Sequence, residues 1–487
     1  MTSSSKNLRK LDRRNLLIGT GALSLASLLS ACTGSSSVPV EGKLSRPNFL
    51  FLPIDDLNDW IGVLGTNANV KTPHIDALAG RGMLFTNAHA QAPICGPSRA
   101  SLMSGLLPHQ TGIYGQVSDD KLRGAINAVS TTPFLTESLK NNGYYTAGRG
   151  KIFHKGAPEG TFHEYFREGE FGPKPAKRMK WDSNRTHTDW GPFPETDAGM
   201  LDFQTASWGA DWLSQSHEDP FFLGLGMIRP HAPWHAPQKW FDLYPLEDIK
   251  LPPWLENDME DVPMSGVALT DVPQMPTIEW AIENNEWRPI LQAYLASISF
   301  MDHCIGIALD ALKASAYADN TYIILFSDNG YHLGEKSRFA KMSLWQRSTR
   351  VPLIITGPRI APSISNAPVG LIDLYPTVLE MAGLPENLEN SGRSLMPLIK
   401  GLPLERGPVT SVYGKDNFAV IGERYRYIRY ETGEEELYDL LDDPNEWKNL
   451  AAEPSYASVK VELSAEIPLK TQPAIKVGAN AGRVRKK

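Results

Sequence analysis

Residues Asn48–Asp56 read Asn-Phe-Leu-Phe-Leu-Pro-Ile-Asp-Asp, an apolar run that ends in two adjacent carboxylates. A short continuous apolar run is typical of a strand buried on both faces of a parallel sheet. Asp55 and Asp56 then fall where that strand ends. This stretch predicts a sheet covered by helices on both faces, with polar side chains gathered at one edge.

Four further apolar runs predict strands of the same kind: Gly143–Gly148, Phe221–Ile228, Thr321–Ser327 and Val351–Thr356. Helical patterns separate them. They include Pro73–Arg81, a helix capped by Thr132 that stops at Asn142-Gly143, and a long apolar stripe from Leu291 to Leu312. The predicted fold class is therefore α/β, a mainly parallel central sheet with helices on both faces.

The sequence changes character after residue 384. Short alternating segments at Asn417–Ile421, Tyr425–Tyr430 and Glu435–Asp439, followed by a helical pattern at Ala457–Ile467, predict a small C-terminal antiparallel α+β subdomain. Residues 155–215 and 240–285 are rich in Pro, Trp and Gly and are expected to be long excursions from the sheet. The predicted organisation is a signal peptide (1–31), a linker (32–45), a catalytic domain (46–384) and the C-terminal subdomain (385–487).

The N-terminus has the features of an export signal. Arg13-Arg14 resembles a twin-arginine signal, and Leu16–Ala31 is apolar but too short to span a bilayer comfortably. Leu29–Cys32 resembles a bacterial lipobox, so we expect lipidation at Cys32. The alternatives are general secretory export and an ordinary cleaved signal with an incidental cysteine. We expect an exported, periplasmic or cell-surface protein that contacts the membrane only through a lipid anchor.

Composition excludes some classes of function. The net charge of −7 becomes more negative without residues 1–31, which hold five basic side chains and one acidic one. A nucleic-acid binder needs a basic face, so nucleic acid is not an expected partner. Three cysteines cannot form a disulfide framework, and Cys304 lies in the long helical pattern, where core packing is expected.

Polar residues follow four predicted strands at the point where each ends. The first strand is followed by the acidic pair, the second by Lys151 and His154, the third by Arg229 and His231, and the fourth by Asp328 and Asn329. In an open α/β sheet, ligands bind beyond the carboxyl ends of the strands. These side chains are therefore expected at one site.

Asp55, Asp56, Asp328 and Asn329 offer only oxygen ligands. Hard oxygen donors without thiolates favour Ca²⁺ or Mg²⁺ over zinc. The alternative for one acidic pair is a solvated loop or a helix cap. Two such pairs, each closing a buried strand, favour a metal site.

The run from Ile94 to Gly105, Ile-Cys-Gly-Pro-Ser-Arg-Ala-Ser-Leu-Met-Ser-Gly, places Cys95 at a predicted helix start. Pro97 suits a first helical turn, and Arg99 follows within it. A helix N-terminus beside a guanidinium is an anion-binding arrangement. The alternative for a lone cysteine is a buried structural thiol.

This run closely resembles the signature of type I sulfatases, which have an alkaline-phosphatase-like fold. The resemblance implies that a formylglycine-maturating enzyme oxidises Cys95 to formylglycine, whose hydrate is the nucleophile. It also implies one Ca²⁺, bound by Asp55, Asp56, Asp328, Asn329 and the modified Cys95.

The resemblance assigns roles to the remaining polar residues. Arg99, Lys151 and Lys341 would clamp the sulfate. His231 would protonate the leaving alcohol, and His154 would remove a proton from the formylglycine hydrate so that sulfate is expelled.

Several segments from Asn48 to Leu384 resemble the iduronate-2-sulfatase subfamily. Arg229, His235 and Tyr331 depart from that subfamily's pattern at places expected to face substrate, so the expected partner is a sulfated carbohydrate rather than iduronate itself. Two other functions compete. One is a phosphatase or phosphodiesterase of the same superfold, for which the second metal cluster is lacking, and the other is a non-catalytic lipoprotein that binds sulfated glycan.

Overall fold

Strand β1 (Asn48–Asp55) lies in the middle of a nine-stranded sheet, and all of its residues are buried. The computed structural model describes residues 46–167, 172, 174–179, 188–404 and 406–475. The predicted signal peptide, the linker and the lipidation site Cys32 lie outside these residues. Within them, β1 pairs in parallel with β6 (Phe221–Pro230) on one side and β8 (Thr321–Ser327) on the other.

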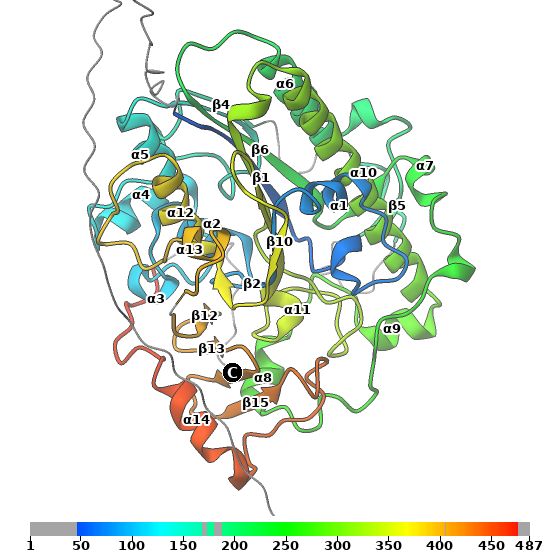
Figure 1. Cartoon of the computed structure of the whole chain (residues 1–487). Helices are drawn as coiled ribbons and strands as arrows, with labels where there is room; N and C mark the ends of the chain where they lie inside the picture. Colours follow the sequence, from blue (N-terminus) through cyan, green and yellow to red (C-terminus); the bar gives the residue numbers. More distant parts are fainter. Residues whose placement is uncertain (1–45, 168–171, 173, 180–187, 405, 476–487) are drawn as a thin grey trace, which may run out of the picture. The chain divides into compact units, whose positions relative to one another are not determined.

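The sheet order is β10-β2-β9-β8-β1-β6-β3-β4, with β11 paired to β2. Figure 1 labels β4, β6, β1, β10 and β2 of this sheet. Only β9 pairs antiparallel with its neighbours β8 and β2, so the mainly parallel sheet that the sequence predicts is confirmed. The other strands are β2 (Met83–His89), β3 (Tyr145–Gly150), β4 (Glu164–Phe166), β9 (Arg350–Thr356), β10 (Ser363–Ser365) and β11 (Val369–Gly370).

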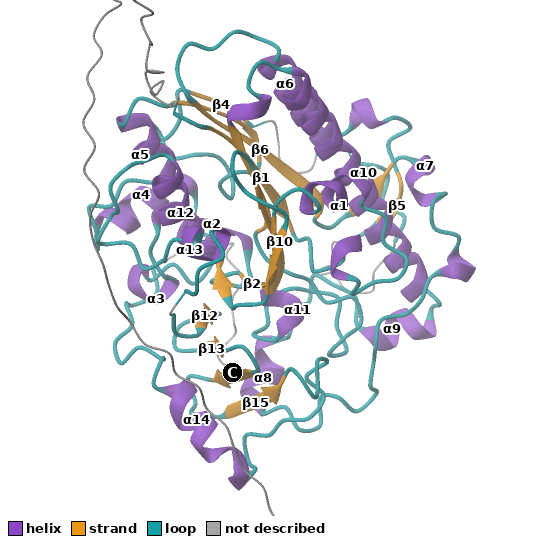
Figure 2. Ribbon diagram, in the orientation of Figure 1, coloured by secondary structure: helices purple, strands orange, loops and turns teal. Residues whose placement is uncertain are grey.

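Helices cover both faces of the sheet (Figure 2). Because side chains alternate along a strand, Leu50, Leu52 and Ile54 of β1 enter one core and Phe49 and Phe51 the other. The first core holds residues of α1 (Pro73–Ala79), α6 (Leu201–Leu213) and α10 (Trp287–Ala314). The second holds residues of α2 (Cys95–Ser104), α5 (Leu135–Asn141) and α12 (Leu374–Met381). Double-sided burial explains why β1 is apolar throughout.

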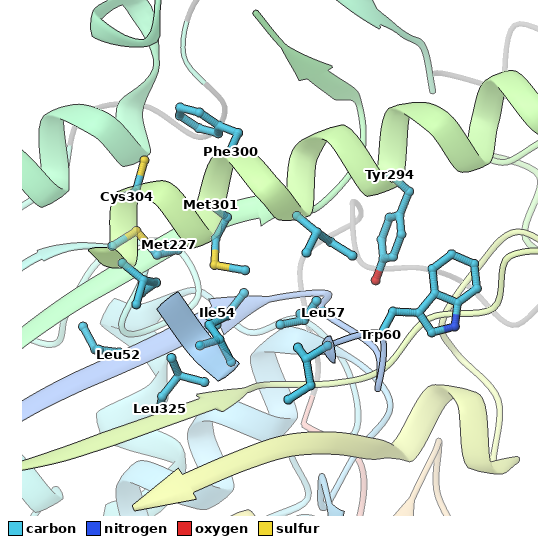
Figure 3. Packing of buried hydrophobic residues seen from close by; sticks show 14 of the residues in the cluster. Leu52, Ile54, Leu57, Trp60, Met227, Tyr294, Phe300, Met301, Cys304 and Leu325 are labelled. Carbon is cyan, nitrogen blue, oxygen red and sulfur yellow. The ribbon is translucent and has the colours of Figure 1, made fainter. Parts of the chain in front are cut away.

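Helix α10 is the long helix that the apolar stripe predicts, and it packs against β1 and β6 through Met301 and its neighbours (Figure 3). Cys304 of this helix is fully buried among these side chains, as predicted. In the described part of the chain, α10 is the one helix long and apolar enough to cross a membrane, and 78% of its most apolar window is buried inside the protein. Its hydropathy is that of a core helix.

Two local predictions were wrong. Helix α5 begins at Leu135 rather than after Thr132, because the Glu137 side chain accepts the backbone N–H of Phe134 and caps the helix there. The excursion at 155–215 contains α6, a helix of 13 residues that packs on α10.

The C-terminal segment forms an antiparallel sheet of β12 (Val409–Val412), β13 (Phe418–Ile421), β14 (Tyr425–Arg429) and β15 (Glu435–Asp439), followed by α14 (Ala457–Ser464). This confirms the antiparallel architecture predicted there. One face packs under α14, and the other packs on Leu344 and Trp345 of the larger sheet's loops. The described residues therefore form one compact unit, and the boundary at 384 stays a prediction.

The remaining elements are short: α3 (Pro108–Thr111), α4 (Asp119–Asn127), α7 (Gln238–Phe241), α8 (Met264–Leu269), α9 (Ile278–Glu283), α11 (Gln346–Thr349), α13 (Met396–Ile399), β5 (Trp190–Pro192) and β7 (Trp234–Ala236).

Candidate active site

The carboxyl ends of β1, β3, β6 and β8 bring a charged cluster together. Asp55 is the last residue of β1, and Lys151 follows β3 and forms an ion pair with it. His231 follows β6, and its Nε2 lies 3.6 Å from Asp56 Oδ2. Asp328 follows β8 and accepts the backbone N–H of Asp56 at 3.2 Å. These strand ends meet because parallel neighbours present the same edge.

Asp56 is the centre of this cluster, and its backbone has a left-handed φ of 62°. Such a conformation costs about 1 kcal/mol or more and persists only where the surroundings fix it. Here the Tyr294 hydroxyl donates to the Asp56 carbonyl at 2.8 Å, and Asn329 Nδ2 donates to Asp56 Oδ1 at 2.9 Å. Lys341 Nζ forms an ion pair with the same carboxylate. The left-handed turn therefore points the Asp56 carboxylate into the cluster, toward Asn329 and Lys341.

Cys95 is the first residue of α2 and is 1% exposed. Its Sγ lies 2.8 Å from Lys341 Nζ and 3.7 Å from Asp56 Oδ1. Burial raises the pKa of the Cys95 thiol, and Asp55 raises it further. Because the thiolate is the reactive form of cysteine, the unmodified side chain is a poor nucleophile at neutral pH.

Three cations balance the three carboxylates. Arg99 Nε donates to Asp328 Oδ2 at 2.6 Å, and its Nη2 lies 3.8 Å from Asp55 Oδ1. Its Nη1 donates to the carbonyl of Ile152 at 3.0 Å, so the guanidinium also fixes the loop after β3. With Lys151 and Lys341, the cluster is neutral when its histidines are neutral. A divalent cation would leave it positive, and an anionic sulfate ester would then be attracted.

Opposing effects shift the pKa of the two buried carboxylates. Burial raises the pKa of Asp55, but Lys151 and the other cations outweigh burial and hold it well below its ordinary value. For Asp328, burial outweighs the attraction of Arg99 and raises the pKa to about 6. Asp55 is thus the more firmly ionised of the two.

The residues present fit a metal ion. Asp55, Asp56, Cys95 and His231 each offer one ligand atom, and these atoms lie within 4.8 Å of one another. Among the described residues, Asp55 Oδ1 and Asn329 Oδ1 are buried oxygens with no hydrogen-bond donor. Orphaned buried oxygens are rare, and a cation would satisfy both. Asp328, a predicted ligand, instead has both oxygens bonded to protein donors here.

The two predicted proton-transfer residues are neutral at pH 7. Burial, assisted by Lys151, lowers the pKa of His154 to about 2. Burial also lowers the pKa of His231 to about 4, against the opposing effect of Asp56. His231 Nδ1 lies 2.5 Å from the Ala232 carbonyl, which can only accept, so Nε2 is the titrating atom.

Arg229 and His235, two of the predicted substrate-facing departures, make bonds within the protein. Arg229 is buried and donates to the carbonyls of His231 and His235, at 2.8 and 3.0 Å. His235 Nδ1 donates to the Gly191 carbonyl at 2.8 Å, next to the pairing of β5 and β7. Both residues therefore brace the loop that carries His231. Tyr331, the third departure, is 3% exposed and stacks on Tyr294.

Sequence reasoning missed several supporting residues. Tyr294 was counted only as a member of an apolar stripe, and its hydroxyl contact with Asp56 has no sequence signal. Asp119 of α4 accepts the backbone N–H groups of Lys155 and Gly156, and Arg167 donates to the His154 carbonyl. These contacts hold the loop that carries His154.

The chain matches two family models. "Sulfatase" covers residues 47–384, and "N-sulphoglucosamine sulphohydrolase, C-terminal" covers residues 334–472. A "Sulfatase" of Formosa agariphila is 45% identical over 92% of this chain and 91% of its own length. Human iduronate 2-sulfatase is 30% identical over 75% of this chain and 74% of its own.

Solved structures share the fold. BT4656, in complex with its substrate D-glucosamine-2-N,6-O-disulfate, superposes with a TM-score of 0.67 at 20% identity, over 86% of this chain and 96% of that one. A phosphonate monoester hydrolase of Agrobacterium radiobacter gives 0.70 at 21% identity, over 86% and 94%. At this identity the likeness concerns the fold alone. The family match and the curated relatives carry the assignment, and the chain belongs to the sulfatase family and is a sulfatase enzyme.

Proposed function

We propose that this sulfatase removes sulfate from a sulfated carbohydrate, with formylglycine made from Cys95 and one bound Ca²⁺. The observation that carries the proposal is the placement of the Cys95 side chain between Lys341 and Asp56. The Cys95 sulfur occupies the place that the oxygens of a formylglycine hydrate would take. The raised pKa of the thiol argues against cysteine itself as the nucleophile.

Asp55, Asp56, Asp328 and Asn329 are the residues that would hold the metal. A divalent ion would supply positive charge against the sulfate oxygens and the oxygen that replaces Sγ. These four residues offer only oxygen ligands, which favours Ca²⁺ over zinc. Asp56 must release Lys341 in part to serve as a ligand, which frees that ammonium to contact sulfate.

Fixed cations supply the remaining electrostatic stabilisation of the sulfate group. Lys151 and Lys341 are 3% and 6% exposed, so they act in a site from which water is largely excluded. Preorganised charge in such a site stabilises the negative charge that spreads over a transferring sulfuryl group. Arg99 uses Nε and Nη1 to hold Asp328 and the loop after β3, whereas its Nη2 has no hydrogen-bond acceptor among the described residues and would be left to contact sulfate.

His231 is the proposed proton donor to the leaving alcohol, at Nε2. This nitrogen is neutral at pH 7, and a bound anion next to it would raise its pKa toward the working range. His154, whose low pKa keeps it neutral, is the proposed proton acceptor.

A carbohydrate substrate is supported by relatives of this chain. Besides human iduronate 2-sulfatase, a Bacteroides thetaiotaomicron relative is the "Delta 4,5-hexuronate-2-O-sulfatase", 27% identical over 86% of this chain. We further propose export, lipid anchoring at Cys32 and dependence on a formylglycine-maturating enzyme. These rest on the sequence of residues 1–32 and on the signature around Cys95.

Two measurements test the proposal. Peptide mass analysis around Cys95 should show the loss expected for conversion of the thiol to the aldehyde, and Cys95→Ser should not show it. Initial rates on a sulfated sugar and on its matching phosphate should favour the sulfate. An unmodified Cys95 in active protein, or faster phosphate hydrolysis, would contradict the proposal and favour the phosphatase alternative.

A further inference from the structure

Arg338 is a buried cation that the mechanism above does not use. It lies in the loop between β8 and α11, three residues before Lys341, and its Nη2 donates to the Lys341 carbonyl at 2.7 Å. Arg338 is 6% exposed, as is Lys341. In the described part of the chain, Nε and Nη1 of Arg338 have no hydrogen-bond acceptor, and no carboxylate lies within 4.0 Å of its guanidinium.

Two other buried arginines pair with a carboxylate. Arg426 is fully buried, and its Nε lies 2.8 Å from Glu446 Oε1. Arg99 pairs with Asp328. A third, Arg229, donates instead to two backbone carbonyls, whereas Arg338 has one carbonyl acceptor for its whole guanidinium among the described residues. Burying an unpaired charge is expensive, so a protein keeps one only where an anion will complete it. Burial lowers the pKa of Arg338 to about 10, against the effect of Tyr413 and Tyr331, which agrees with a guanidinium that lacks a counter-charge.

The backbone around Arg338 is strained and firmly held. Lys336 and Ser337 have left-handed φ values of 51° and 53°, and Met342 has a φ of 70°. Lys336 Nζ donates to Asp258 Oδ1 at 2.7 Å, which anchors the start of the segment. Strained non-glycine residues persist where the structure around them fixes them, and they cluster at functional sites. The strain here brackets the two cations, Arg338 and Lys341.

The neighbourhood of Arg338 connects directly to the sulfate site. The Tyr331 hydroxyl donates to the carbonyl of Phe339, the residue after Arg338, at 3.3 Å. The Tyr331 ring stacks on that of Tyr294, whose hydroxyl donates to the Asp56 carbonyl. Arg338 and Lys341 are three residues apart in the chain, so their Cα atoms lie within roughly 10 Å of each other. A sugar that holds its sulfate at Lys341 can therefore bring a second substituent to Arg338.

We propose that Arg338 binds a second anionic group of the substrate, a carboxylate or a second sulfate on the same sugar or its neighbour. This inference rests on the proposed carbohydrate substrate and specifies its charge. A guanidinium presents a planar fork of donors that matches either group in two parallel hydrogen bonds. Arg338 thereby selects doubly charged sugars over singly charged ones.

The experiment compares paired substrates that differ only in the second charge. One pair is a monosulfated, uronate-containing disaccharide and its methyl ester. The other is a neutral disaccharide with one sulfate or with two. Each is assayed with the wild type, Arg338→Met and Arg338→Lys, and 4-nitrophenyl sulfate, which has no second anion, reports on the sulfate site alone.

For the preferred anion, wild type should favour the charged partner by roughly 10- to 100-fold in kcat/KM, mostly through KM. Arg338→Met should abolish this preference and Arg338→Lys should keep part of it. Because Arg338 also donates to the Lys341 carbonyl, the rates of each variant are divided by its own rate on 4-nitrophenyl sulfate, so that a general loss of activity cancels from the comparison. The pair that shows the preference tells carboxylate from sulfate.

Equal rates within both pairs for wild type would overturn the role of Arg338, and this result needs no variant to fold. A preference that survives in Arg338→Met would also overturn it. If wild type cleaves 4-nitrophenyl sulfate but none of the four sugars, the proposed carbohydrate substrate fails as well, so the two failures are distinguishable.

Discussion

Lys341 Nζ lies 2.8 Å from Cys95 Sγ, although the two residues are 246 positions apart in the chain. The ammonium comes from the loop after β8 and the thiol from the first residue of α2. The fold therefore places a fixed positive charge against the Cys95 side chain.

Replacing Lys341 with Met should lower kcat/KM on sulfate esters by roughly 10²- to 10³-fold, because one preorganised charge is lost from the transition state. Initial-rate kinetics and a thermal melt of the same preparation check this. The matched control is Lys400→Met, which removes an exposed lysine paired with Glu380 and should change neither rate nor melting temperature by much. A Lys341→Met enzyme with normal kinetics would remove this residue from the site.

Calcium should stabilise the folded protein as well as support activity. After dialysis against a chelator, adding Ca²⁺ at 100 times its Kd should raise the free energy of unfolding by about 2.7 kcal/mol, since only the native state forms the site. Differential scanning calorimetry measures this without any substrate. Asp55→Ala should lose the shift, whereas Asp373→Asn, which alters a buried carboxylate paired with Arg406, should keep it. An unshifted wild-type melt would contradict a calcium site.

His231→Ala should affect substrates according to their leaving groups. A sugar alcohol needs a proton as it leaves, so its turnover should fall by roughly 10²- to 10⁴-fold, whereas an aryl sulfate should lose much less. Parallel kcat measurements on a sulfated sugar and on 4-nitrophenyl sulfate give the comparison. Equal losses on both would show that His231 is not the acid.

His109 should make the protein sensitive to acid. Burial lowers its pKa to about 4, and its ring lies 6.0 Å from that of Phe418. Above pH 6.5 the native and unfolded chains are both neutral at this residue. As the pH falls from 6.5 to 4, only the unfolded chain takes up the proton, and stability is lost by at most about 3 kcal/mol.

His109→Phe keeps a ring next to Phe418 and removes the titration. Its melting temperature should therefore fall less steeply than that of the wild type between pH 6.5 and pH 4, with little difference at pH 7.5. Identical slopes for the two proteins in acid would show that His109 does not contribute.

The sequence was most informative where a single local pattern decides the structure. The run Asn48–Asp55 is apolar because it is buried on both faces, so both the strand and the polar residues at its end were readable. Strand β2 was missed because Thr86 and Asn87 interrupt its apolar pattern, although pairing with β9 and β10 makes it a strand. Helix α6 was missed because its Trp, Gly and charged residues obscure the periodicity.

In the candidate site, too, residues in local motifs could be predicted and residues that act through long-range contacts could not. Cys95 and the acidic pair lie in recognisable local motifs, whereas the contact of Tyr294 with the Asp56 carbonyl links positions 238 apart and leaves no trace in composition or spacing. Arg338 looks like any surface arginine in the sequence. Only the three-dimensional arrangement reveals that it is buried without a carboxylate partner.

The burial of Cys95 also constrains the order of events in the life of the molecule. A modifying enzyme cannot reach a side chain that is 1% exposed and in contact with Lys341 and Asp56. The proposed oxidation of Cys95 would therefore have to take place on the nascent or still unfolded polypeptide. Under that proposal, a copy that folds first would be correctly shaped but inactive, and the yield of active enzyme would depend on the relative rates of maturation and folding.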